Sequence, residues 1–331
     1  MRFVVYGPGA IGGVIGGLLH QAGRDVVLIA RGEHLSAIQR RGLRVETPVG
    51  TTVAEVEAVG SPDEVGWRRD DVVLLTMKSD ATPAAVRSLA ASAPAETAVV
   101  CAQNGVANEP TALRWFEHVY GVCVMMPAAH LTPGVVESNS TPTPGILDIG
   151  RYPTGVDDRC RDVATALGEA AFVSEARADI MRWKHRKLLI NLANAVAAVC
   201  ARGPEFEELR ALIVAEGEAA LKAAAIEPVT EAEDNERRGD ILRRGDIGGR
   251  PRGGGSTWQS LQRATGAIET DYLNGEVVLL GRQHGVPTPA NELIRQQASR
   301  LAATRAGPAS VDAADLLALL HPQQEGTLRR P

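Results

Sequence analysis

The chain has 331 residues, which is enough for two domains with separate hydrophobic cores. Its hydrophobic fraction of 44% is ordinary for a globular protein, and its net charge of −5 excludes a general electrostatic attraction to nucleic acid or anionic membranes. No apolar run is long enough to span a bilayer, and "GPG" interrupts the apolar N-terminus, which argues against a signal peptide. We therefore expect neither nucleic acid nor membrane as a partner.

The 4 cysteines are far apart in the sequence and form no CxxC pair. They are Cys101, Cys123, Cys160 and Cys200. This spacing indicates reduced thiols and neither a disulfide framework nor a zinc site. We therefore expect a cytoplasmic protein that holds no metal.

Short apolar runs alternate with helical patterns over the first half of the chain. The predicted strands are 2–7, 25–30, 71–78, 98–103, 120–126 and 145–150, and the predicted helices between them are 10–22 and 82–93. Buried strands that alternate with helices are typical of a doubly wound, mainly parallel sheet. The sequence thus predicts an α/β domain of this kind over residues 1–175.

Strand patterns end at about residue 176, and long helical periodicity follows. The predicted helices are 179–200, 205–226, 258–285, 287–304 and 311–320. They predict an all-helical domain over residues 176–320. The Gly- and Arg-rich segment 237–257 reads as a mobile loop, and Ser256 and Thr257 after it are expected to cap the next helix. The tail 321–331 is expected to be disordered.

A glycine motif follows the first predicted strand. In "VVYGPGAIGG", Gly7, Gly9 and Gly12 have the spacing GxGxxG between a strand and a helix. The first glycine permits a tight turn, the second lets the backbone approach a pyrophosphate, and the third lets the helix pack on the strand. We therefore expect Gly7, Gly9, Ala10, Ile11 and Gly12 to bind a dinucleotide of the Rossmann type. The alternative is a glycine-rich turn that binds nothing.

Three further residues lie at or just beyond predicted strand ends, where doubly wound sheets bind ligands. Arg31 follows the second strand, at a position from which it can pair with the 2′-phosphate of NADP, so we expect NADP(H) as the cofactor. Lys78 ends the third strand and Asn104 follows the fourth, and both are expected to point toward the cofactor. The alternatives are a surface arginine, a solvated lysine and a turn-forming asparagine.

The predicted helix 179–200 contains "WKHRKLLINLANAVAAVC", which is apolar on nearly every side. Lys187, Asn191 and Asn194 nevertheless share one face, with Lys184 and Arg186 at what we expect to be the wetter end. A buried lysine and buried amides need partners, so this face is a candidate site. Glu269 could hold the Lys187 ammonium charged and ready to donate a proton. The alternatives are a structural salt bridge for Lys187 and a surface position for Glu269.

The chain resembles the ketopantoate reductase family. The motifs that carry the resemblance are "GPGAIGG", "MKS", "QNGV", "WKHRKLLINLAN" and "IETDYLNGEVVLLGRQHGVPTP", and they extend over both halves of the chain. The resemblance implies an N-terminal Rossmann domain and a C-terminal helical domain. It implies an NADPH-dependent oxidoreductase that reduces 2-dehydropantoate (ketopantoate) to pantoate in pantothenate biosynthesis. It leaves a homodimer open as the oligomeric state.

The resemblance also implies roles for single residues. Lys187 matches the lysine that protonates the forming alkoxide, and Glu269 matches the glutamate associated with it. Asn104 matches an asparagine at the nicotinamide and substrate, Asn191 a substrate-binding asparagine, and Lys78 a lysine of the cofactor cleft. The remaining expected substrate-binding residues are Asn194, Ser256 and Thr257.

The chain departs from the family pattern at positions expected to face the substrate. The family pattern has a second asparagine in this helix at the position that is Ala195 in this chain. Here the asparagine is Asn194, one residue earlier. Thr257 replaces a serine, and Leu261 stands where the family has an aspartate. Two alternatives therefore stay open. One is a reductase of the same family with a different ketone substrate, and the other is a non-catalytic NADP-binding sensor.

Overall fold

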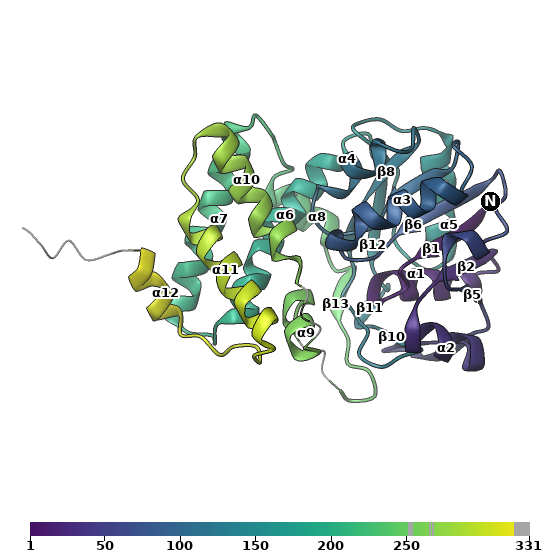
Figure 1. The fold of residues 1–331 in the computed structure, drawn as a ribbon, viewed down its shortest axis with the longest axis horizontal. Helices are drawn as coiled ribbons and strands as arrows, with labels where there is room; N and C mark the ends of the chain where they lie inside the picture. The colour runs from purple at the N-terminus through teal and green to yellow at the C-terminus, as the bar shows by residue number, and fades with distance from the viewer. Residues whose placement is uncertain (251–253, 265, 267, 321–331) are drawn as a thin grey trace, which may run out of the picture. The chain divides into compact units, whose positions relative to one another are not determined.

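The computed structural model describes residues 1–250, 254–264, 266 and 268–320 (Figure 1), so the expected tail 321–331 lies outside the described part. The chain forms two compact units. The first contains Met1–Leu188 and the segment from Pro228 to residue 250, and the second contains Leu189–Glu227 and the described residues from Gly254 onward. Within the described residues, no helix combines the length and the apolar composition needed to cross a membrane.

The first unit is built on a seven-stranded sheet whose central strand β1 lies between β6 and β2. The strand order is β12 (Ile146–Arg151), β8 (Val119–Met125), β7 (Ala98–Cys101), β6 (Asp71–Leu75), β1 (Arg2–Tyr6), β2 (Val26–Ile29) and β5 (Glu57–Val59). All neighbours pair in parallel except β12 with β8. The doubly wound, mainly parallel sheet predicted from the sequence is confirmed.

Helices cover both faces of this sheet, so successive residues of a strand belong to different cores (Figure 1). Phe3 and Val5 of β1 pack with α1 (Ala10–Gln21), α2 (Gly32–Arg41) and α5 (Asp158–Glu169). Val4 and Tyr6 pack on the opposite face with α3 (Thr82–Ser92) and α4 (Asn108–Leu113). This double burial explains why the strands read as continuous apolar runs.

Two smaller sheets and two short 3₁₀ turns complete the first unit. A four-stranded sheet has the order β4 (Gly50–Ala54), β3 (Leu43–Thr47), β10 (Val135–Ser138) and β9 (Ala128–Ala129), and the turns are η1 (Pro62–Glu64) and η2 (Ser79–Ala81). The two-stranded sheet pairs β11 (Ser140–Pro142) with β13 (Leu242–Arg244).

The expectation that 237–257 is entirely a mobile loop was wrong. This stretch contains the end of α8 (Glu231–Arg238), strand β13 and the first two residues of α9. The strand was missed because its hydrogen-bond partner β11 lies about a hundred residues earlier in the chain, and a local pattern does not reveal such a pairing.

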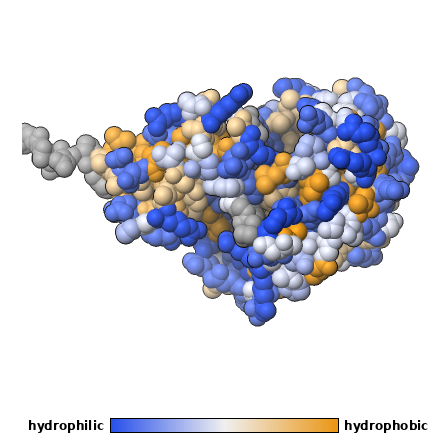
Figure 2. All heavy atoms as spheres, turned by 90° about the horizontal axis from the view of Figure 1, so that it is seen from below, coloured by the Kyte–Doolittle hydropathy of each residue, from blue (hydrophilic) through white to orange (hydrophobic). Residues whose placement is uncertain are grey.

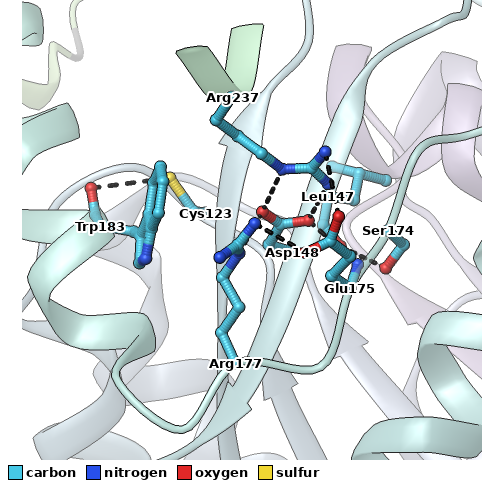
Figure 3. A network of polar contacts seen from close by, with 8 residues as sticks. All are labelled: Cys123, Leu147, Asp148, Ser174, Glu175, Arg177, Trp183 and Arg237. Carbon is cyan, nitrogen blue, oxygen red and sulfur yellow. Dashed lines mark hydrogen bonds and ion pairs between the residues drawn. The ribbon is translucent and has the colours of Figure 1, made fainter. Parts of the chain in front are cut away.

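A buried carboxylate attaches the segment from Pro228 to the sheet of the first unit. Asp148 of β12 accepts hydrogen bonds from Arg237 Nε at 2.8 Å, Arg237 Nη2 at 2.6 Å and Arg177 Nε at 2.7 Å (Figure 3). The backbone N–H of Glu175 donates to the same carboxylate at 3.0 Å. Charge-assisted bonds of this kind are among the strong ones, so we regard Asp148 as the anchor of α8.

The second unit is helical throughout its described residues. It contains the later part of α6 (Ile180–Val199), α7 (Pro204–Ala223), α9 (Ser256–Gln262), η3 (Glu269–Tyr272), α10 (Asn274–His284), α11 (Pro289–Thr304) and α12 (Ala313–Leu320). Glu216 of α7 accepts hydrogen bonds from the backbone N–H groups of Ala290 and Asn291, at the first turn of α11. A carboxylate at a helix N-terminus is favourable, and here it fixes two helices to each other. The expected helical character of this part of the chain is confirmed, but the segment from Pro228 to residue 250, with strand β13, belongs to the first unit.

The single predicted helix 258–285 was wrong, because the structure divides it into α9, η3 and α10. Ala264 and Gly266 have φ values of +50° and +74°, which no α-helix accommodates. The expected cap is also shifted, because Gly255 is the N-cap of α9 and Ser256 is already helical.

Several large apolar side chains are exposed at the surface of the described residues. On the face drawn in Figure 2, hydrophilic and apolar residues are both visible. The exposed large apolar side chains are Val49, Val53, Leu113, Trp115, Leu131, Leu279 and Leu319. Single exposed apolar residues are normal in globular proteins and need no partner to explain them.

Loss of Arg237 should destabilise the first unit. In Arg237→Leu, Asp148 keeps Arg177 but loses two bonds in a buried setting, and we expect a cost of about 3 kcal/mol in the free energy of unfolding. Arg161→Leu, which removes an exposed pair with Asp158, is the matched control and should cost less than about 0.5 kcal/mol. Urea unfolding measures both, and limited proteolysis should cut the Arg237 variant faster within 239–250. Equal stability of the two variants would contradict the anchoring role.

Candidate active site

The turn between β1 and α1 is tightly fixed by its neighbours. Gly7 has a φ of +85°, a left-handed conformation that favours glycine. Thr76 Oγ1, just after β6, lies within hydrogen-bond distance of the carbonyl oxygens of Tyr6 at 3.0 Å and Gly7 at 2.9 Å. A side chain at Gly12 would collide with the Thr76 hydroxyl. The motif therefore brings helix, strand and turn together as its spacing predicted.

The N-terminus of α1 has the properties of an anion site. A Cβ atom on Gly9 would meet only the carbonyl oxygen of Gly7, at 4.0 Å, so the space in front of this residue is open. No side chain caps the helix, and its first turn contains no acidic residue. Unpaired backbone N–H groups and the helix dipole favour a negative group here. The turn thus fits the pyrophosphate of a dinucleotide.

Arg31 lies directly after β2, at the N-cap of α2, and its side chain is exposed. Its Nη2 donates a hydrogen bond to the hydroxyl of Tyr6 at 3.2 Å. Tyr6 ends β1, so the guanidinium lies next to the strand that leads into the glycine turn. The position fits a phosphate on the ribose of a dinucleotide.

The ends of β6 and β7 are joined by the side chain of Asn108. Its Nδ2 donates to Ser79 Oγ at 3.1 Å and to the carbonyl oxygen of Asn104 at 3.2 Å. Lys78, next to Ser79, and Asn104 are both half-buried. The structure thus brings together the two turns that carry Lys78 and Asn104, at the sheet edge where ligands of such folds bind.

Helix α6 places Lys184 in the core, which corrects the expectation that Lys184 lies at a wetter end. The side chain of Lys184 is only 3% exposed, and its Nζ lies 2.6 Å from Glu109 Oε1. Lys187 is half-buried, and Arg186 pairs with Glu231 at 3.2 Å. Burial of the lysine is tolerated because a buried carboxylate neutralises it.

The two asparagines of α6 contact each other, and Asn194 also reaches the start of α9. Asn194 Nδ2 donates to Asn191 Oδ1 at 3.3 Å, with Asn191 buried and Asn194 half-buried. A Cβ atom on Gly255 would lie 3.1 Å from Asn194 Oδ1. Ser256 directly follows this glycine in the second unit.

Thr257 of α9 carries a buried hydroxyl group. The Thr257 side chain is buried, and its Oγ1 has no hydrogen-bond partner among the residues that the structure describes. A buried hydroxyl without a partner costs free energy, so a bound polar group would be favoured there. Leu261, one turn later in α9, is buried in the apolar core, where the aspartate of the family pattern would be costly.

Glu269 is the first residue of η3 and is half-buried. It belongs to the second unit, whereas Lys187 belongs to the first. Their pairing therefore stays a prediction.

Titratable groups near Lys187 are held neutral. Burial raises the pKa of the Cys123 thiol to about 11, against the opposing effect of Lys187 and Lys184. Burial also lowers the pKa of His185, whose Nδ1 lies 2.7 Å from the carbonyl oxygen of Met181. The Cys123 thiol is therefore protonated and the His185 imidazole neutral near pH 7.

Sequence reasoning missed Lys184, Glu109, Thr76 and Asn108 as parts of the site. Lys184 stands three residues before Lys187 and seven before Asn191, so the helical spacing could have placed it on the same face. Glu109 and Asn108 had no such signal, because their partners come from other elements. Over the described residues, no group of three or more His, Cys, Asp and Glu side chains could hold a metal ion.

Gly9→Ala should separate ligand binding from folding. The new methyl group meets no protein atom closer than 4.0 Å, so the fold should persist, but it occupies the open space and should weaken NADPH binding by more than about tenfold, or roughly 1.4 kcal/mol. Gly12→Ala should instead lower stability through its collision with Thr76, and Gly168→Ala in α5, with open space around it, should change neither property. Calorimetric titration with NADPH and thermal unfolding distinguish the three. Unchanged affinity in Gly9→Ala would refute the anion site.

Two family models match the chain. The model described as ketopantoate reductase PanE/ApbA matches residues 3–154, and the model of the C-terminal part of the same family matches residues 179–302. A 2-dehydropantoate 2-reductase of Pyrococcus horikoshii is 34% identical over 200 residues, which cover 60% of this chain and 64% of that relative, less than two thirds of its length. The protein of the same name from Caulobacter vibrioides is 30% identical over 308 residues, or 88% of this chain and 95% of the relative.

Solved structures agree with these matches. A PanE/ApbA family ketopantoate reductase from Ralstonia eutropha has a TM-score of 0.78 at 27% identity and covers 92% of this chain and 99% of its own. D-mandelate dehydrogenase with NADH and anilino(oxo)acetate has a TM-score of 0.76 with the same coverages, but at 21% identity it shows a shared fold alone. Because the family models cover most of both halves of the sequence and the Caulobacter relative aligns over most of its length, the chain belongs to the ketopantoate reductase family.

Proposed function

We propose that this protein is an NADPH-dependent reductase of a 2-oxo acid. We further propose 2-dehydropantoate as its substrate, pantoate as its product and pantothenate biosynthesis as its pathway. One observation carries the proposal: Lys184 Nζ donates to the carbonyl oxygen of Gln103 at 2.9 Å. The helix that bears Lys187 is therefore attached to the turn that bears Asn104. The names of the relatives support the choice of substrate.

The residues of the first unit fit NADPH. The N-terminus of α1 would hold the pyrophosphate, Arg31 the 2′-phosphate, and the turns with Lys78 and Asn104 the nicotinamide end. When bound, the cofactor supplies the hydride that reduces the carbonyl carbon of the substrate.

Lys187 would donate a proton to the carbonyl oxygen as negative charge develops there. Its half-buried position strengthens this interaction relative to bulk water, because the effective dielectric constant is lower. Glu269 would orient the ammonium and keep it charged. Asn104, Asn191 and Asn194, with Ser256 or Thr257, would hold the carboxylate and hydroxyl groups of the substrate, and thereby place the carbonyl for reaction.

The decisive experiment is an assay of NADPH oxidation with ketopantoate beside a panel of other 2-oxo acids. A value of kcat/KM for ketopantoate well above that of the other acids is the expected result. A reductase with another ketone substrate would prefer a different member of the panel, and the changes at Ala195, Thr257 and Leu261 favour this second candidate. A sensor would bind NADPH without oxidising it in the presence of any carbonyl compound.

The cellular location and the oligomeric state are proposals as well. A cytoplasmic location is supported by the four cysteines, all buried and free. A homodimer stays a hypothesis that sedimentation analysis tests.

Lys187→Ala should lower kcat by about 10²- to 10⁴-fold, the usual contribution of a general acid, while the Kd for NADPH changes little. Stopped-flow kinetics and fluorescence titration measure the two quantities. Lys222→Ala removes an exposed lysine of α7 and serves as the control. Full activity of the Lys187 variant would end the proposed mechanism.

Arg31→Ala should weaken NADPH binding by roughly ten- to a hundredfold, since one charge-assisted hydrogen bond contributes about 1.5–3 kcal/mol. Binding of NADH, which has no 2′-phosphate, should change little. Arg40→Ala, an exposed arginine in the last turn of α2, is the matched control. If the Arg31 variant loses affinity for both cofactors equally, Arg31 does not select NADPH.

A further inference from the structure

Lys184 and Glu109 form an ion pair that is buried almost completely within the first unit. Their side chains are 3% and 0% exposed, and Nζ lies 2.6 Å from Oε1. Removing two charges from water is costly, and well-packed apolar residues in such positions are often as stable or more stable. Stability alone is therefore a weak explanation for this pair.

The ammonium group of Lys184 contacts three segments of the first unit. It forms the ion pair with Glu109 of α4 and donates hydrogen bonds to the carbonyl oxygens of Gln103 at 2.9 Å and Val122 of β8 at 3.2 Å. One ion pair and two hydrogen bonds thus fix the position of this atom of α6. The start of this helix is thereby oriented relative to the sheet.

The sheet provides space for the pair at Gly121 of β8. A Cβ atom there would lie 3.2 Å from both Glu109 Oε1 and Lys184 Cδ. Both distances are tighter than an ordinary contact, so even alanine would press on the pair. The other residues of the strand form an apolar run, and the missing side chain of Gly121 leaves room for the ion pair.

The ion pair is linked by hydrogen bonds to the backbone on either side of Asn104. Lys184 binds the carbonyl oxygen of Gln103, the residue before it, while Asn108 at the start of α4 binds the carbonyl oxygen of Asn104 itself. Glu109, the next residue of α4, returns to Lys184. The backbone of Asn104 is thus enclosed in a ring of contacts that closes on one ammonium group.

We propose that Lys184 and Glu109 are positioning residues that fix the position of Lys187 relative to Asn104. Lys187 follows Lys184 by three residues, which is about 4.5 Å along the helix and about 60° around it. An ammonium that binds the turn of Asn104 therefore also fixes where the side chain of Lys187 begins. The inference rests on the proposed function, which assigns Lys187 and Asn104 to the reacting carbonyl.

The test is the double variant Lys184→Met with Glu109→Gln, which removes both charges and avoids a lone buried charge. We expect kcat with ketopantoate to fall about 10²-fold, the cost of a misplacement of about 1 Å, while Kd for NADPH and the unfolding temperature stay close to their original values. Hydrogen exchange should rise at the backbone amides of 103–108. A purely structural pair would lower the unfolding temperature and leave kcat of the folded enzyme unchanged.

The matched control is the buried pair of Arg2 and Asp71, whose side chains are 5% and 0% exposed at 2.7 Å, at the opposite ends of their strands from the site. Arg2→Met with Asp71→Asn should leave kcat and the exchange of 103–108 unaltered. Unchanged kcat, or unchanged exchange at 103–108, in the Lys184 and Glu109 double variant overturns the inference. If the original protein reduces no 2-oxo acid, the proposed function fails, and the exchange measurement still decides the positioning role.

Discussion

The candidate site depends on one constraint, which is that buried polar groups need hydrogen-bond or ion-pair partners. Helix α6 is apolar on most sides, yet it carries Lys184 and Asn191 at buried positions. The ammonium of Lys184 meets this need with an ion pair to α4 and hydrogen bonds to β8 and the turn after β7. Once this atom is fixed, the rotation of the helix about its axis is fixed as well. Lys187 and Asn194, at intervals of three and four residues, then continue one polar stripe.

Parallel pairing gathers the other candidate residues at one edge of the sheet. β1, β2, β6 and β7 all end on the same side, so the glycine turn, Arg31, Lys78 and Asn104 follow neighbouring strand ends. Side-chain hydrogen bonds from Thr76 and Asn108 then hold the connecting turns. The open space at Gly9 lies at this edge, where the dipole of α1 adds its favourable field for an anion.

The departures from the family pattern are concentrated in the second unit. An asparagine at position 195 would point into the core, because Ala195 is buried, whereas Asn194 is half-buried and lies close to Gly255 at the start of α9. The amide is thus presented toward the residues that carry Ser256 and Thr257. Leu261 of the same helix is buried. The difference at positions 194 and 195 changes which amide is accessible and leaves the glycine turn of the first unit as it is.

The sequence alone determined the features that depend on local patterns. Six of the seven strands of the large sheet, the glycine turn, helix α6 and the helical character of the second unit follow from runs and spacings of neighbouring residues, whereas the edge strand β5 was not predicted. Only the tertiary structure decided the pairing of β13 with β11, the break at Ala264 and Gly266, and the burial of Lys184. Lys184 and Gln103 are 81 residues apart, and the energy of a buried charge depends on such distant partners. A helical pattern shows which residues share a face of the helix, but the residues that pack against this face come from elsewhere in the chain.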